Sequence, residues 1–151
     1  MLDARVRAVV DRLPPDEIGR FLFSITAPQT DCEVLELPAR STVWIAAGVR
    51  YFGGRVLALD PQPDAVRAHL ADAGLGDWAL VTDRHVREID DVFDLVVLHE
   101  PADAERWSLV RERVEPGALI VAQEPVDDPD VEWTRVERTG SAGLALGVVL
   151  R

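Results

Sequence analysis

The chain has 151 residues, 48% of them hydrophobic, which is the size and composition of one globular domain with a substantial core. Its formal net charge of −11 makes nucleic acids and anionic membranes poor partners, because both would repel it. All 16 basic residues are arginine, so Schiff-base chemistry, a lysine general base and a P-loop lysine are excluded.

The sequence also carries signals about location. No apolar run approaches the ~20 residues that span a bilayer, and residues 1–5 do not resemble the start of a secretory signal. The single cysteine, Cys32, cannot form an internal disulfide or a zinc cluster, and its position at the start of a strand predicts a small core residue. We therefore expect a cytoplasmic protein.

Two amphipathic segments open the chain and predict helices over residues 2–13 and 15–26. Pro14-Pro15 ends the first helix, and Pro28 closes the second. We assign residues 1–27 to these N-terminal helices and residues 32–151 to the core of one domain that covers residues 1–151.

Predicted strands and helices alternate from residue 33 onwards. Ser41 or Thr42 can cap a helix that runs to about Phe52, and Gly53-Gly54 and Gly74 supply left-handed helix stops. Further helices are predicted over residues 64–73 and 103–114. The predicted strands cover residues 33–37, 55–59, 78–81, 93–98 and 118–122.

The last part of the chain reads differently. Residues 131–138 alternate in polarity, residues 144–150 are apolar, and the connection between them is too short for a helix, so the two runs predict an antiparallel hairpin. The fold class that follows is α/β: a Rossmann-like sheet of about seven strands, mostly parallel, with an antiparallel C-terminal hairpin and helices on both faces in three αβα layers.

Open sheets of this class bind ligands at the carboxyl ends of their strands. The residues at that edge are Leu37 to Ser41, Asp60, Asp83, His99-Glu100 and Gln123-Glu124. His99 and Glu124 are the candidate catalytic pair, either as a general base beside an acid or as ligands of a transition metal. The alternative is that His99 ends a strand without binding any ligand.

Three stretches resemble class I S-adenosylmethionine-dependent methyltransferases. "EVLELPARSTVWIAAGVRYFGGRVLALD" looks like the first strand, cofactor loop, helix and second strand of that family, "FDLVVLHE" like its fourth strand, and "VEPGALIVAQE" like its fifth. The resemblance covers about Arg20 to Arg151 and is closest to bacterial O-methyltransferases similar to catechol O-methyltransferase. It implies a transferase that binds S-adenosylmethionine and a small-molecule acceptor.

The resemblance also implies which residues would bind the cofactor. Asp60 stands where the family has an acid that binds the ribose, Asp83 where an acid lies near the adenine, and Glu36 matches a common acid of the first strand. The alternatives are that Asp60 only forms a turn with Pro61 and that Glu36 faces the neighbouring helix N-termini in a structural role. The first loop supplies the other candidates, which are Pro38, Ala39 and Ser41.

The chain departs from the family at positions that matter for chemistry. Its first loop, Leu37 to Ser41, has no glycine, although glycine lets a cofactor approach the backbone. His99, Gln123 and Glu124 stand where metal-dependent members carry the carboxylates and amide that bind magnesium, so we expect no magnesium and assign no metal-binding residue. Whether His99 and Glu124 hold a transition metal stays open. We therefore expect weak binding of S-adenosylmethionine.

Two functions remain open at this point. The first is an O-methyltransferase-like enzyme whose activity is altered or lost, in which His99 or Glu124 orients or deprotonates the acceptor. The second is a methyltransferase-like pseudoenzyme that serves as a binding or assembly module. With either function, the chain could form a homodimer or bind a partner protein.

Overall fold

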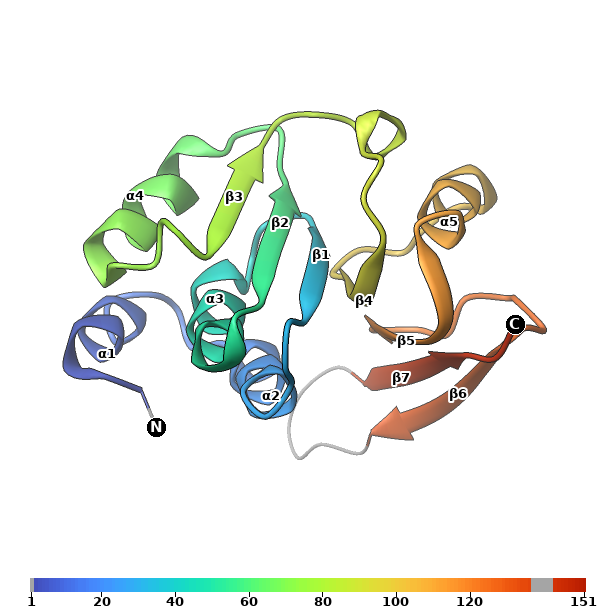
Figure 1. Cartoon of the computed structure of the whole chain (residues 1–151), viewed down its shortest axis with the longest axis horizontal. Coiled ribbons are helices and arrows are strands. Elements are labelled where there is room, and N and C mark those ends of the chain that lie inside the picture. The colour runs from blue at the N-terminus through green and yellow to red at the C-terminus, as the bar shows by residue number, and fades with distance from the viewer. Residues whose placement is uncertain (1, 137–142) are drawn as a thin grey trace.

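The computed structural model describes residues 2–136 and 143–151, and within them seven strands form one sheet in the order β3-β2-β1-β4-β5-β7-β6 (Figure 1). The strands are β1 (Glu33–Leu37), β2 (Arg55–Leu59), β3 (Ala79–Thr82), β4 (Phe93–Leu98), β5 (Val114–Ala122), β6 (Val131–Val136) and β7 (Leu144–Val149). The helices are α1 (Ala4–Val10), α2 (Glu17–Thr26), α3 (Thr42–Val49), α4 (Asp64–Ala73) and α5 (Ala104–Arg111), with short 3-10 helices η1 (Arg50–Phe52) and η2 (Val86–Glu88).

Local sequence explains where the helices begin and end. Asp3, Asp16 and Asp103 each accept a backbone N–H at the start of α1, α2 and α5, which satisfies a donor that the helix itself leaves free. Gly53 and Gly74 follow η1 and α4 in the left-handed conformation, with φ of 88° and 72°. These are the predicted stops, and glycine takes this conformation without a Cβ penalty.

The predicted sheet topology is confirmed. Strands β1 to β5 pair in parallel, while β7 runs antiparallel to both β5 and β6. The predicted end of the first hairpin strand at residues 137–138, and the turn at residues 139–142, lie outside the described residues.

One boundary was predicted wrongly. The helix expected to reach residue 114 ends at Arg111, and the strand expected to begin at residue 118 begins at Val114. Gly117, with φ of 94°, lets the backbone adjust inside the strand, and the pairing of β4 with β5 shifts register there. The Pro-Gly pair therefore marks an irregularity within the strand rather than a turn before it.

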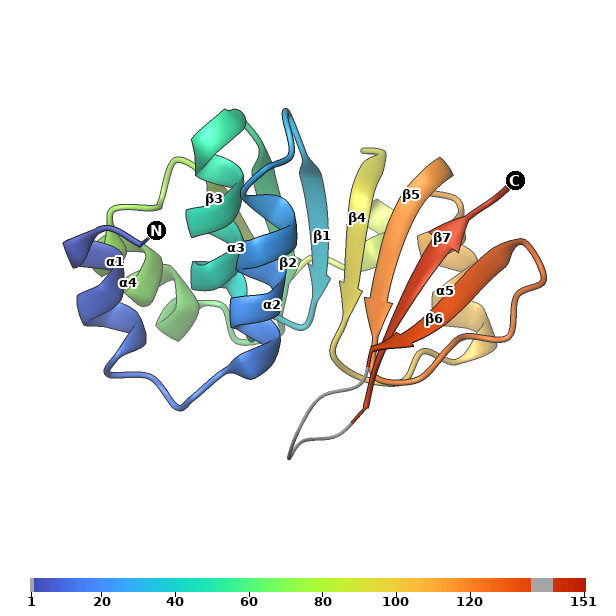
Figure 2. The same ribbon diagram turned by 90° about the horizontal axis from the view of Figure 1, so that it is seen from below.

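The helices form the two outer layers of the predicted three (Figure 2). α1 to α4 contribute Val6, Leu22, Val43 and Leu70 to a core on one face, where β1 and β2 contribute Val34 and Val56. α5 packs Trp107 and Val110 on the other face, against residues that include Leu35 and Val96. Because neighbouring strand residues point to opposite faces, the central strands β1, β4 and β5 contribute to both cores. No helix in the described ranges is long and apolar enough to span a membrane.

Candidate functional site

Glu36 organises the loop that follows β1. Its side chain is fully buried, which is costly for a carboxylate unless hydrogen bonds compensate. The backbone N–H groups of Arg40 and Ser41 donate to Oε2 at 3.2 and 2.7 Å, and the Thr42 hydroxyl donates to Oε1. Glu36 therefore holds the first turn of α3 and the loop before it in place.

His99 completes this buried cluster. Its Nε2 lies 2.7 Å from Oε2 of Glu36, and its backbone N–H donates to the Leu37 carbonyl at 2.9 Å. Two backbone N–H groups already donate to the same oxygen, and they can only donate, so we assign the hydrogen of this bond to Nε2. Within the described residues, Nδ1 has no hydrogen-bond partner. A neutral His99 then presents a free lone pair at Nδ1.

A cleft of about 510 Å³ lies at the carboxyl ends of β1, β2 and β3. Leu37, Pro38, Asp60 and Asp83 line it, as does Arg40. The Asp60 carboxylate accepts the backbone N–H of Ala39 at 3.2 Å and of Gln62 at 2.8 Å. Asp60 is half-buried, and its free lone pairs face an opening large enough for a nucleoside.

A second pocket, of about 450 Å³, lies on the other side of the first loop. His99 and Gln123 line it together with Arg40. The rest of its lining is mostly apolar and comes from the α1–α2 connection, α2, α3 and α4; it includes Leu13, Pro14, Ile18, Val43, Trp44 and Val66. Such a pocket suits an apolar small molecule that presents one polar group to His99.

Arg40 separates the two cavities. Its Nη2 donates to the Glu100 carboxylate at 2.7 Å, and its Nη1 donates to the His99 carbonyl at 3.4 Å. Both charged side chains are 51% exposed, so the ion pair contributes only ~0–1 kcal/mol to folding. Arg40 thus lines both cavities, and its guanidinium is held only weakly.

The structure of this chain, but not its sequence, matches known proteins. No protein-family model matches the sequence, and no curated protein sequence matches it either. The structure is similar to cofactor-bound Rv0187 from MTB, with a TM-score of 0.75, 24% identity, and coverage of 97% of this chain and 88% of that one. The chain has the fold of S-adenosylmethionine-dependent methyltransferases.

Two other methyltransferases show the same likeness. The O-methyltransferase TomG from Streptomyces achromogenes, in complex with SAM, matches with a TM-score of 0.75 and 17% identity over 100% of this chain and 92% of that one. The O-methyltransferase from Bacillus cereus, in complex with SAH, matches with a TM-score of 0.75 and 20% identity over 99% and 92%. The methyltransferase fold expected from the resemblance is therefore confirmed.

The predicted site residues divide between several places in this methyltransferase fold. Pro38, Asp60 and Asp83 line the cleft together. Ala39 is buried and reaches the cleft only through its N–H bond to Asp60, and Ser41 lines the second pocket instead, where its hydroxyl donates to Asp16 at 2.7 Å. Glu36 lines neither cavity.

The expected pair of His99 and Glu124 is not assembled. Glu124 is exposed and forms an ion pair with Arg135 of β6 at 3.1 Å, while the carboxylate beside His99 is that of Glu36. Hairpin β6–β7 brings Arg135 to the end of β5, which explains the partner that Glu124 finds. Among the described residues, no group of three or more His, Cys, Asp or Glu side chains is arranged to hold a metal ion.

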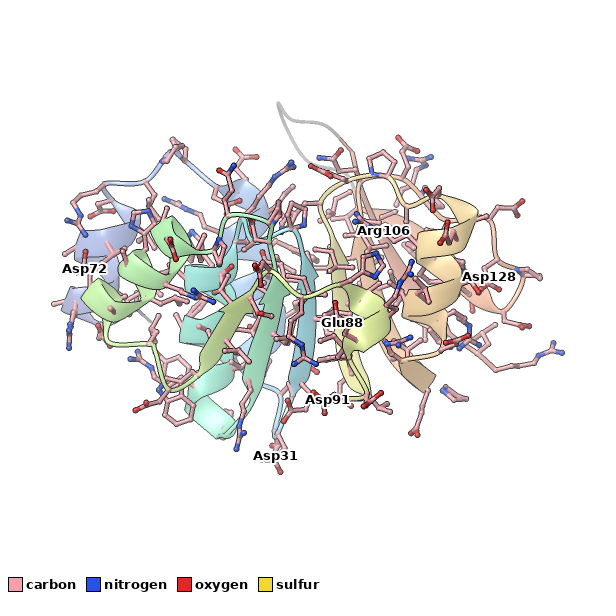
Figure 3. The ribbon with its side chains drawn as sticks, turned by 90° about the horizontal axis from the view of Figure 1, so that it is seen from above. Asp31, Asp72, Glu88, Asp91, Arg106 and Asp128 are labelled. Atoms are coloured by element: carbon pink, nitrogen blue, oxygen red, sulfur yellow. The ribbon has the colours of Figure 1, made fainter. Side chains whose placement is uncertain are left out.

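Sequence reasoning missed other residues at both cavities. Arg84, His85 and Arg106 line the cleft, and Asp16 and Trp44 line the second pocket. Arg106 lies on α5, so only the tertiary packing brings it to the cleft (Figure 3). Asp16 caps the start of α2, and its bond to the Ser41 hydroxyl joins segments 25 positions apart, which local sequence patterns do not reveal.

Proposed function

We propose that this chain is an O-methyltransferase-like protein of altered activity, which binds S-adenosylmethionine weakly in the cleft and an apolar hydroxyl compound in the second pocket. The observation that carries this proposal is the meeting of the two cavities at Arg40, with His99 beside them. Methyl transfer needs such a geometry, because the two reactants must be held in line and close together. The fold shared with known methyltransferases supports it.

The cleft fits one end of this cofactor better than the other. Asp60 and Asp83 offer carboxylate oxygens to ribose and adenine, so the nucleoside end fits the donors present. On the side of the first loop, Pro38 has no N–H to donate, and Arg40 adds a positive charge to the lining, which would disfavour a sulfonium. Bound S-adenosylmethionine would supply an electrophilic methyl group. The loop opposes that binding, so affinity about 30- to 1,000-fold below that of a glycine-rich loop is expected.

His99 is the residue that we assign to the acceptor proton. Glu36 holds Nε2–H, so Nδ1 can take the hydroxyl proton of an acceptor in the second pocket. In this proposal Glu36 is a positioning residue, because it sets the tautomer and the ring orientation. A histidine base also removes the need for a metal, and His99 and Gln123 replace carboxylates at the positions that bind magnesium in metal-dependent members of the family.

A second candidate function is the non-catalytic module. It is favoured by the fact that two groups of the cleft already have partners within the protein: Asp60 accepts the N–H of Ala39, and Arg40 is paired with Glu100. A protein that had lost its cofactor would be expected to pair its former binding groups in this way.

Calorimetric titration tests the proposal and separates these candidates. S-adenosylmethionine and S-adenosylhomocysteine are titrated into the protein with and without magnesium, and a radiolabelled methyl assay follows with small aromatic alcohols. Weak, magnesium-independent binding with transfer supports the enzyme; silent titrations at millimolar ligand support the module. A dissociation constant in the low micromolar range would show that the loop does not weaken binding, and a rate that a chelator abolishes and magnesium restores would remove His99 from its assigned role.

The His99→Gln variant tests the base itself. Transfer should fall by about 10²- to 10⁴-fold, while S-adenosylhomocysteine binding is kept. Circular dichroism and a thermal melt show whether this buried substitution preserves the fold. Equal transfer by a folded variant would contradict the role of His99.

A further inference from the structure

The sheet has one stretch that the helices leave uncovered. On the face where α5 and η2 pack over β4 and β5, no helix of the described chain covers β2 and β3 (Figure 3). A row of three paired leucines crosses β1, β2 and β3 on this face: Leu35, Leu57 and Leu80. Leu35 is fully buried, Leu57 half-buried and Leu80 59% exposed. The apolar row therefore continues beyond the layer that should bury it.

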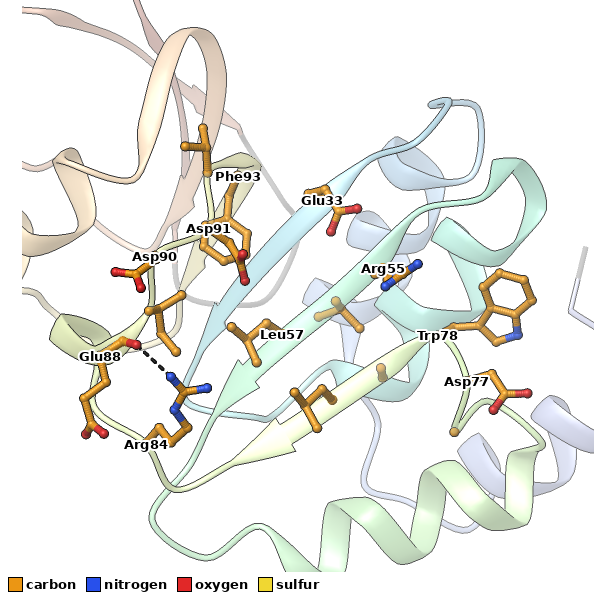
Figure 4. Close-up of a pocket in the computed structure, with 16 residues that line it drawn as sticks. Glu33, Arg55, Leu57, Asp77, Trp78, Arg84, Glu88, Asp90, Asp91 and Phe93 are labelled. Atoms are coloured by element: carbon orange, nitrogen blue, oxygen red, sulfur yellow. Dashed lines mark hydrogen bonds between the residues drawn. The ribbon is translucent and has the colours of Figure 1, made fainter.

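The uncovered face is a hollow of about 650 Å³ and not a flat surface (Figure 4). Val92, which is 49% exposed, extends the apolar floor on one side. Soluble monomers seldom leave such neighbouring large apolar side chains open to water without a use for them.

The rim of this hollow is acidic. Five carboxylates line it, and only two arginines oppose them; the carboxylates are those of Glu33, Asp77, Glu88, Asp90 and Asp91. One arginine, Arg84, already donates a hydrogen bond from Nη2 to the Glu88 backbone carbonyl at 2.7 Å. Desolvation, together with the charges of Asp94, Asp91 and Asp31, raises the pKa of Glu33 against the opposing effect of Arg55. The hollow is therefore a place of negative potential with an apolar floor.

We propose that this uncovered face of β1 to β3 is a docking surface for a cationic amphipathic helix of a partner protein. Its apolar stripe covers Leu57, Leu80 and Val92, and its Lys and Arg side chains meet Asp90, Asp91 and Glu33. β2 has five residues, about 16 Å of strand, so a helix of about 11 residues would cover it. This inference does not depend on methyl transfer.

Two other occupants fit the surface less well. A second copy of this chain, in a two-fold dimer through this face, would bring the same carboxylates close to their copies. A strand added to the free edge of β3 would need the Val81 carbonyl, which already accepts a bond from the Arg67 side chain of α4 at 2.9 Å.

The test uses a synthetic peptide as the probe. It is acetylated and amidated, with leucines spaced every three or four residues and lysines elsewhere, and it is titrated into the full chain at low salt. NMR shifts should map to Leu57 and Leu80, and Leu80→Ser should weaken binding about tenfold. The double variant Asp90→Asn/Asp91→Asn should weaken it about five- to tenfold.

The matched control is Asp11→Asn/Glu132→Gln, which removes the same charge from exposed residues of other elements. It should change affinity by no more than about twofold, because it alters only the net charge. Three outcomes would overturn the proposal: no binding at millimolar peptide, equal losses in both double variants, or equal binding of a peptide with glutamates for lysines. A wild-type dimer that Leu80→Ser dissociates would assign the face to self-association and would also overturn it.

Discussion

Strand β1 has a glutamate near each end, and the two differ in their burial and in their hydrogen-bond partners. Glu36, at the carboxyl end, is fully buried and accepts hydrogen bonds from Arg40, Ser41, Thr42 and His99. Glu33, at the amino end, is half-buried, and its carboxylate accepts no hydrogen bond from the described residues. Three carboxylates and one cation, Arg55, act on it through their charges instead.

The difference follows from the segments that pack at the two edges of the sheet. The carboxyl edge receives the loop and the N-terminus of α3, which supply N–H donors that point at Glu36. The amino edge receives the turns before β1 and β4, which contribute Asp31 and Asp91, and the start of β4, which contributes Asp94. None of these residues donates a hydrogen bond to Glu33. A carboxylate thus organises the candidate site at one edge, and at the other it adds to the charge of an open surface.

The largest expected effect is on stability when Glu36 is removed. Glu36→Ala leaves four donors without their acceptor, two of them backbone groups, so the free energy of unfolding should fall by about 3–5 kcal/mol. Thermal melting should show a Tm lower by about 10 °C. Glu33→Ala on the same strand is the control and should cost less than about 1 kcal/mol. Comparable losses of unfolding free energy in the two variants would mean that the hydrogen bonds to Glu36 do not stabilise the carboxyl edge.

The next effect concerns Arg40, which belongs to the loop bound by Glu36 and lines both cavities. Arg40→Ala removes a half-exposed ion pair and a cation, so stability should hardly change while affinity for S-adenosylmethionine should rise about tenfold. The rise should be smaller for uncharged S-adenosylhomocysteine. Arg106→Ala removes the same charge from the cleft but not from the loop, and calorimetry should show a smaller gain for it. Weaker binding by Arg40→Ala would mean that Arg40 grips the ligand.

A smaller effect is expected at the end of β2, where the edge is open to the cleft. Asp60→Asn turns one acceptor into a donor, which should weaken binding of S-adenosylhomocysteine about five- to tenfold. Stability should fall by no more than about 1 kcal/mol, in contrast to Glu36→Ala. Asp64→Asn, on the exposed start of α4, is the control. Unchanged affinity in Asp60→Asn would place the nucleoside elsewhere.

The fold could be predicted because its signals are local. The apolar runs of β1, β2 and β4 and the glycines after η1 and α4 mark the elements directly. The start of β5 was missed because a Pro-Gly pair that usually ends a segment lies within the strand. The antiparallel hairpin of β6 and β7 could be predicted because polar and apolar residues alternate along β6 and because the connection to β7 is too short for a helix.

The site could be predicted only in part, since its contacts join distant segments. The strand-end rule placed Asp60, Asp83 and His99 at the correct edge. That Glu36 meets His99, which is 63 positions away, depends on the register of β1 with β4, which pairs Leu37 with Leu98. That Glu36 faces the N–H groups of the loop and the start of α3 is the structural alternative that its place at the end of the first strand already allowed.

The smallest effect returns to Glu33 and concerns pH. Burial first, and then Asp94, Asp91 and Asp31, raise the pKa of its carboxyl above the ordinary value of 4.5, so the folded state binds this proton more tightly than the unfolded state does. Stability from this group is therefore present below pH 4.5 and is lost as the pH rises through the raised pKa. The Gln side chain of Glu33→Gln cannot ionise, so this variant should melt about 1–2 °C above wild type at pH 7 after solvent screening, and at the same temperature as wild type near pH 4.

Thermal melts of both proteins between pH 4 and 7 measure this difference, with Glu115→Gln at the start of β5 as the exposed control. A gain that persists at pH 4 would trace the effect to packing, and a loss at pH 7 would mean that Arg55 outweighs the carboxylates around Glu33.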